Sequence, residues 1–131
     1  MDKKEILGYW IGTADSDYST MTNLYESEDY HWSLFMGHLV IEKLIKAIYI
    51  INIGNNPPKT HDLLRLADKA LIETSKEQKD LLDLLTTFNI SARYPDYKHS
   101  FYKKCTHKFT IENIKKIKEL RTWLLSIVED K

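Results

Sequence analysis

The segment from Asp29 to Ile53 constrains the fold most, because its apolar residues cover nearly every side of the helix that it is expected to form. These residues are Trp32, Phe35, Met36, Leu39, Val40, Leu44, Ile45 and Ile48. A helix that is apolar all round must be covered by other elements. The sequence therefore predicts that this helix lies at the centre of a helical bundle or is buried in a dimer interface.

Four further helices are predicted around it, and no alternating strand pattern competes with them. One covers about Lys4–Tyr25, and a short one follows Thr60, which is expected to be its N-cap. Another begins at the capping-box sequence Ser75–Gln78, and the last begins at about Ile111. The predicted fold is all-α, an up-and-down four-helix bundle with an additional short helix.

Pro95 is expected to end the fourth helix at Arg93 and Tyr94, because the residue before a proline avoids the helical conformation. Residues 96–108 are then predicted to form a long loop, and such loops are often functional or mobile. The stretch interleaves tyrosine and phenylalanine with lysine, a composition suited to contacting RNA. The alternative is a loop that packs on a dimer mate.

A chain of 131 residues is expected to form one domain over residues 1–131. Its one cysteine, Cys105, excludes an intramolecular disulfide and favours a reducing compartment. No signal peptide is visible, and the longest apolar stretch, Leu44–Ile53, is about half of the ~20 residues that a membrane span needs. We therefore expect a cytoplasmic protein that does not enter a membrane.

The formal charge is zero, but it is unevenly distributed. Residues 1–31 carry a net charge of −5, and residues 93–121 carry +6. This separation suits self-association or an anionic ligand at the basic end. The alternative is that both segments are solvated helix faces.

Several charged residues interrupt the apolar helix faces. Asp17 lies within the apolar stripe of the first helix, so it must be paired or lie at an edge. Lys43 is its expected partner if the first two helices are antiparallel, and it is also a candidate to line a ligand pocket. His61 is expected just inside a helix N-terminus, where it could bind an anion or hydrogen-bond locally. Glu42 and Lys46 are expected to form an ordinary i,i+4 pair that contributes only ~0.2–0.5 kcal/mol.

Four local patterns, in order along nearly the whole chain, resemble the HEPN domain family. They are Trp10 with Ala14 and Asp17, the run His38–Ala47, the run Thr60–Leu63, and the run Ala92–Asp96. The resemblance implies a helical bundle that pairs with a second copy through its long helices. Some family members are ribonucleases, often toxins coupled to a small nucleotidyltransferase, whereas others bind nucleotides. The Ala92–Asp96 sequence resembles this second, ARYPD-type branch at least as closely.

The resemblance also implies a candidate catalytic pair. Cleaving members carry an arginine followed by a histidine after a short spacing that Arg93 and His99 match. Such a pair can cut RNA without a metal, because histidine moves a proton while arginine stabilises the charge on the phosphate. Pro95 lies between the two residues and is expected to prevent them from sharing one continuous helix. The alternative is that His99 is an exposed loop histidine.

Arg93, Tyr94 and Asp96 are stronger candidates for nucleotide binding, since arginine pairs with phosphate and tyrosine stacks on a base. In the structural alternative Arg93 pairs with Asp17 or Asp96. The leading hypothesis is a nucleotide- or RNA-binding homodimer that partners a nucleotidyltransferase-type protein. The alternatives are a metal-independent endoribonuclease and a purely structural dimerisation domain.

Metal or cofactor chemistry is not indicated. His99, Cys105 and His107 lack a fourth ligand at a familiar zinc-site spacing. The sequence also has no glycine-rich phosphate loop and no nucleophile elbow. No metal and no cofactor are therefore expected.

Overall fold

The computed structural model describes residues 2–130, and in that range it contains six α-helices and no strand. The helices are α1 (Lys3–Glu26), α2 (Tyr30–Asn52), α3 (Leu63–Lys69), α4 (Lys76–Arg93), α5 (Pro95–Lys104) and α6 (His107–Glu129). The all-α prediction is confirmed, and the expectation of five helices is wrong by one. None of the helices within residues 2–130 is long and apolar enough to cross a membrane.

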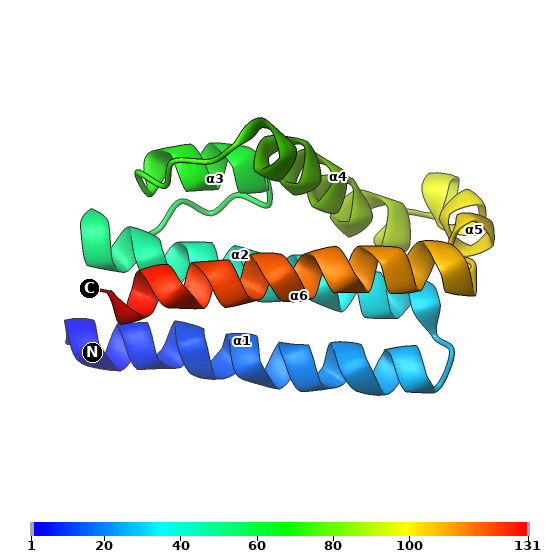
Figure 1. Ribbon diagram of the computed structural model, residues 1–131, viewed down its shortest axis with the longest axis horizontal. Helices are drawn as coiled ribbons and strands as arrows, with labels where there is room; N and C mark the ends of the chain where they lie inside the picture. Colours follow the sequence, from blue (N-terminus) through cyan, green and yellow to red (C-terminus); the bar gives the residue numbers. More distant parts are fainter. Residues whose placement is uncertain (1, 131) are drawn as a thin grey trace.

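Helix α2 lies at the centre of the fold. Helices α1, α3, α4 and α6 all pack against it, and α5 lies at the end of the molecule where α1 turns into α2 (Figure 1). Side chains along α2 with no exposed surface include Leu34, Val40, Ile41, Ile45 and Ile48. The prediction of a covered central helix is therefore confirmed within the single chain.

The contact between α1 and α2 includes an ion pair, and the contact between α2 and α6 includes a glycine that faces an isoleucine. Lys43 Nζ lies 2.5 Å from Oδ2 of Asp17, so the predicted pairing of these residues is confirmed. A β-carbon at Gly37 would lie only 2.6 Å from Cδ1 of Ile117 on α6. Glycine at this position lets α2 and α6 approach closely.

Residues 96–108 do not form the predicted loop. Pro95 ends α4 at Arg93 and is itself the first residue of α5, and α6 then begins at His107 rather than at about Ile111. Proline suits the first helical position, because its missing N–H has no partner there and its φ is already helical. Pro95 therefore separates two helices that meet at Tyr94.

The start of α3 also differs from the prediction. Asp62, not Thr60, is the N-cap, and its side chain accepts a hydrogen bond from the N–H of Arg65. The Thr60 hydroxyl instead accepts from the N–H of Asp62 at 3.2 Å. His61 consequently precedes α3 and does not lie inside its N-terminus.

Candidate functional site

Arg93 ends α4, and its side chain is held in a defined position. Nε donates to the backbone carbonyl of Asn89 at 3.1 Å, and one terminal nitrogen donates to Oδ1 of the same residue. Asn89 is only 2% exposed, so the residue that accepts both hydrogen bonds from Arg93 is itself held by packing. An arginine has five N–H donors, and three of them are left for a ligand.

The charge of Arg93 is not neutralised by any carboxylate in residues 2–130. The alternative prediction, that Arg93 pairs with Asp17 or Asp96, is wrong because Asp17 pairs with Lys43. The guanidinium carbon lies 5.8 Å from the ring centroid of Phe35 and 5.6 Å from that of Tyr94. An exposed, oriented cation between two aromatic rings is suited to bind an anion or a base.

The other residues predicted near Arg93 surround the α4–α5 junction. Tyr94 is 52% exposed and caps both helices, and Asp96 lies exposed in the first turn of α5. A carboxylate there interacts favourably with the helix dipole, which gives Asp96 a structural role as well. His99 lies exposed further along α5, so the expected break between it and Arg93 is present.

The other two predicted site residues, Lys43 and His61, do not lie at the α4–α5 junction, and each has a different acidic partner. Lys43 faces α1 through Asp17. His61 belongs to a polar cluster around the buried Glu42 of α2, in which its Nδ1 lies 2.7 Å from Oε1 of Glu42. The second carboxylate oxygen of Glu42 accepts from Nζ of Lys46 at 3.1 Å. This Glu42–Lys46 pair is buried, so the expectation of an ordinary i,i+4 pair is wrong.

His38 connects this cluster to the surroundings of Arg93. Its side chain is fully buried, and Nε2 lies 3.1 Å from the carbonyl oxygen of His61. Burial lowers the pKa of His38, the hydrogen bond to the His61 carbonyl and the charge of Glu42 partly oppose this shift, and the charge of Arg93 adds a smaller lowering. Phe35, His38 and Glu42 are spaced three and four positions apart, so they lie on one face of α2. Arg93 and His61 therefore cover the same face of the central helix.

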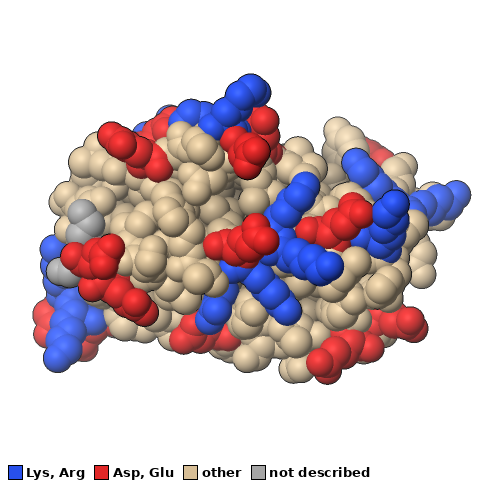
Figure 2. Space-filling model, viewed as in Figure 1, with Lys and Arg blue, Asp and Glu red and all other residues tan. Residues whose placement is uncertain are grey.

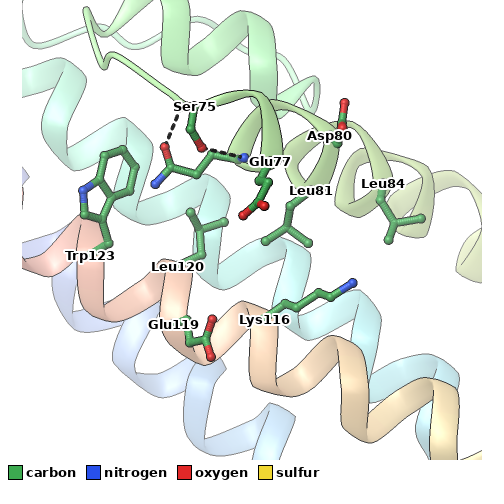
Figure 3. Close-up of a pocket in the computed structure, with 10 residues that line it drawn as sticks. Ser75, Glu77, Asp80, Leu81, Leu84, Lys116, Glu119, Leu120 and Trp123 are labelled. Atoms are coloured by element: carbon green, nitrogen blue, oxygen red, sulfur yellow. Dashed lines mark hydrogen bonds between the residues drawn. The ribbon is translucent and has the colours of Figure 1, made fainter.

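A hollow of the surface lies away from Arg93. A groove of about 670 Å³ separates the start of α4 from the middle of α6 (Figure 3). Its floor is apolar, with Leu81, Leu84, Leu120 and Trp123, and its rim carries Glu77, Asp80 and Glu119 beside one lysine, Lys116. Three carboxylates repel a phosphate, so this groove does not fit the anionic ligand that Arg93 suits.

The basic segment identified in the sequence is spread over three helices, from Arg93 at the end of α4 through α5 to α6. Lysine and arginine side chains gather over the middle of α6, with acidic side chains among them (Figure 2). Arg121 on this helix is occupied, because it donates to Asp15 at 3.3 Å and lies over the ring of Tyr18. The +6 segment therefore does not form one uniform anion-binding surface, and Arg93 differs from Arg121 in having no acidic partner within residues 2–130.

Metal ligation is not indicated by the described residues, among which no group of three potential ligands is close enough to hold an ion. Burial raises the pKa of the Cys105 thiol to about 12, so the sulfur is protonated at neutral pH. A protonated thiol is a poor nucleophile and a poor metal ligand. Cys105 is therefore interpreted as a packing residue.

Sequence reasoning missed the residues that position the candidates. Asn89 is a polar residue on the buried face of α4. A polar residue at such a position indicates a side chain that has a hydrogen-bond partner, and this was the one sign of its role in the sequence. His38 is likewise a polar residue on an apolar helix. Their partners lie on other turns or in a loop, so the sequence alone could not identify them.

One comparison with known proteins gave a result. The family model described as HEPN domain matches residues 7–128. No curated protein sequence and no solved structure gave a significant match. The matched range includes every candidate residue described above.

Proposed function

Because the chain belongs to the HEPN domain family, we propose that it is a nucleotide- or RNA-binding module that works as a homodimer and holds its ligand at the α4–α5 junction. Arg93 is assigned to the phosphate, and Tyr94 to stacking on a base. Asp96 borders the same junction, and its carboxylate is assigned to accept from a base or sugar N–H or O–H group. We further propose that α1, α2, α4 and α6 form the family's up-and-down four-helix bundle. The Ala92–Asp96 sequence supports a proposed assignment to the ARYPD-type branch.

One observation carries this proposal. Arg93 is exposed and fixed by the buried Asn89, and it has no carboxylate partner within residues 2–130. A cation that serves only the fold is expected to be paired or fully solvated. An oriented guanidinium with free donors is instead preorganised for a ligand, which lowers the cost of binding.

Binding of a short single-stranded RNA, measured by fluorescence anisotropy, tests the proposal. Arg93→Ala is expected to weaken binding by about tenfold to 100-fold, because it removes charge-assisted hydrogen bonds. Arg65→Ala is the matched control, since Arg65 is an exposed arginine on α3. Equal losses in both variants would reduce the effect to general charge, and no binding by the wild-type protein at millimolar RNA or nucleotide would end the proposal.

The homodimer is supported by the surface next to Arg93. The exposed apolar and aromatic side chains there are Ile90, Tyr94, Tyr97 and Tyr102, each 48–63% exposed. Exposed apolar and aromatic side chains gathered around one end of a monomer are typical of an interface. A monomeric mass in sedimentation at the concentrations used for binding would remove the dimer from the proposal. Copurification with a nucleotidyltransferase-type protein would test the proposed partner in the same way.

RNA cleavage is a second candidate function, favoured by the free donors of Arg93. A guanidinium that binds a phosphate also stabilises the charge that develops on it during cleavage. Single-stranded RNA is then cut in the presence of EDTA, and Arg93→Ala lowers the rate by about 100-fold. Unchanged activity in the variant would identify a contaminating nuclease. In this candidate function the arginine–histidine motif assigns the proton transfer to His99. The purely structural alternative makes a different prediction, namely that no nucleotide or RNA changes the melting temperature of the protein.

A further inference from the structure

Helices α4 and α6 meet at one end and separate at the other. Phe88 near the end of α4 and Phe109 near the start of α6 have ring centroids 6.1 Å apart. Toward the start of α4 the two helices diverge, and the groove of about 670 Å³ lies between them (Figures 1 and 3). Both helices also pack on α2. The groove is therefore an opening in the side of the helical bundle, with a helix along each edge.

Each of the two helices presents apolar side chains to the groove. Leu81 and Leu84 are three positions apart on α4, and Leu120 and Trp123 are three positions apart on α6, so each pair lies on one face of its helix. Figure 3 shows Leu81 and Leu120 pointing toward one another across the groove. Leu81, Leu84 and Trp123 are only partly buried by the chain itself. An apolar stripe laid along the groove would remove their remaining surface from water.

The edges of the groove are acidic. Glu77, Asp80 and Glu119 line it, against one lysine, Lys116. Asp80 also lies 3.5 Å from Nζ of the exposed Lys76, whereas Glu77 and Glu119 have no basic partner within residues 2–130. The excess negative charge attracts a cationic partner and repels an anionic one.

The structural alternative assigns these groups to the stability of the helices. It accounts for Glu77, which lies in the first turn of α4, where a carboxylate interacts favourably with the helix dipole. It does not account for Glu119, which is exposed in the middle of α6. The start of α4 is also satisfied without Glu77, because the Ser75–Gln78 capping box supplies both of its hydrogen bonds (Figure 3). Apolar walls between acidic edges instead match a partner that is apolar on one stripe and basic beside it.

We propose that the groove between α4 and α6 is a docking site for a basic amphipathic helix of a partner protein. The apolar residues of that helix, spaced three and four positions apart, pack on the leucines and the tryptophan of the groove. Its lysine or arginine residues face Glu77 and Glu119. No residue that lines the groove belongs to the α4–α5 junction, so the docking site does not depend on the proposed function.

The test uses two synthetic helical peptides of about 18 residues. One has leucine at positions three and four apart with lysine beside them, and the other keeps the leucines and replaces each lysine with glutamate. Binding is followed by NMR of the indole N–H signals of Trp10, Trp32 and Trp123, the chain's three tryptophans. The basic peptide should shift the Trp123 signal alone, with a dissociation constant of about 10–100 µM, and the acidic peptide should bind at least about tenfold more weakly.

Variants of the groove identify the contacts. Glu77→Lys combined with Glu119→Lys should weaken binding of the basic peptide by about tenfold or more, because like charges then face each other. Glu112→Lys is the matched control, since Glu112 is an exposed glutamate on α6 that does not line the groove, and it should bind as the wild type does. Leu84→Ala should weaken binding by about threefold to tenfold through lost apolar contact. Circular dichroism checks that each variant is folded.

Equal affinity for the two peptides would overturn the proposal, as would an equal loss in Glu112→Lys and the double variant. An unchanged Trp123 signal at millimolar basic peptide would also overturn it. A Trp123 signal that shifts with protein concentration in the absence of peptide would show that a second copy of the chain, and not a partner protein, occupies the groove.

These outcomes are separate from those of RNA binding. Leu84→Ala should bind single-stranded RNA as the wild type does, and Arg93→Ala should bind the basic peptide as the wild type does. Failure of peptide binding therefore leaves the proposed function standing, and failure of RNA binding leaves the docking site standing.

Discussion

Replacing Glu42 with alanine is expected to lower the free energy of unfolding by about 3 kcal/mol. The carboxylate is buried and is the shared partner of Lys46 and His61. Its removal leaves the Lys46 ammonium, 5.2 Å from the centroid of the Trp10 ring, without an anion in a largely buried site. Urea denaturation followed by circular dichroism measures the change.

Glu119→Ala is the control for this loss, because Glu119 is an exposed glutamate in the middle of α6. It is expected to change the free energy of unfolding by less than about 0.5 kcal/mol. A loss below about 1 kcal/mol in Glu42→Ala would mean that Lys46 reaches water on its own, and that the cluster on α2 is not a structural unit.

Phe88→Ala is expected to destabilise the fold by about 4 kcal/mol. Phe88 on α4 is 1% exposed, and its ring centroid lies 5.3 Å from that of Phe101 on α5 and 6.1 Å from that of Phe109 on α6. The cavity left by alanine therefore loosens three helices at once, including α5, which begins two residues after Arg93.

Ile90→Ala on the same helix provides the comparison, because this side chain is 48% exposed. Its expected loss is below about 1 kcal/mol in the same urea experiment. Similar losses for the two variants would contradict the interpretation that Phe88 joins α4, α5 and α6.

The helices could largely be predicted from the sequence, because each carries its own apolar face. The run Gly54–Pro58 marks the end of α2, and the Ser75–Gln78 capping box marks the start of α4. For Pro95 the sequence rule predicts only the end of a helix, since it restricts the residue before a proline and not the residues after it. Proline also favours the first position of a helix, and this second preference accounts for the start of α5 at Pro95.

The candidate site could be predicted only in part. Arg93, Tyr94 and Asp96 came from a local sequence pattern, and all three lie at one helix junction. The surroundings of Glu42 could not be predicted, because its partner Lys46 lies over the Trp10 ring of α1 and its other partner, His61, is nineteen positions away. Spacing along one helix shows which side chains are neighbours on that helix and gives no information about what covers them.

The central claim is that the guanidinium of Arg93 contacts the ligand, and NMR of the arginine side chains tests it most directly. The chain has only three arginines, Arg65, Arg93 and Arg121, so their Nε–H signals can be assigned by single substitutions. On addition of a short single-stranded RNA, the Arg93 signal is predicted to shift while those of Arg65 and of Arg121, which is bound to Asp15, stay in place. RNA that binds and leaves the Arg93 signal unchanged would contradict the account.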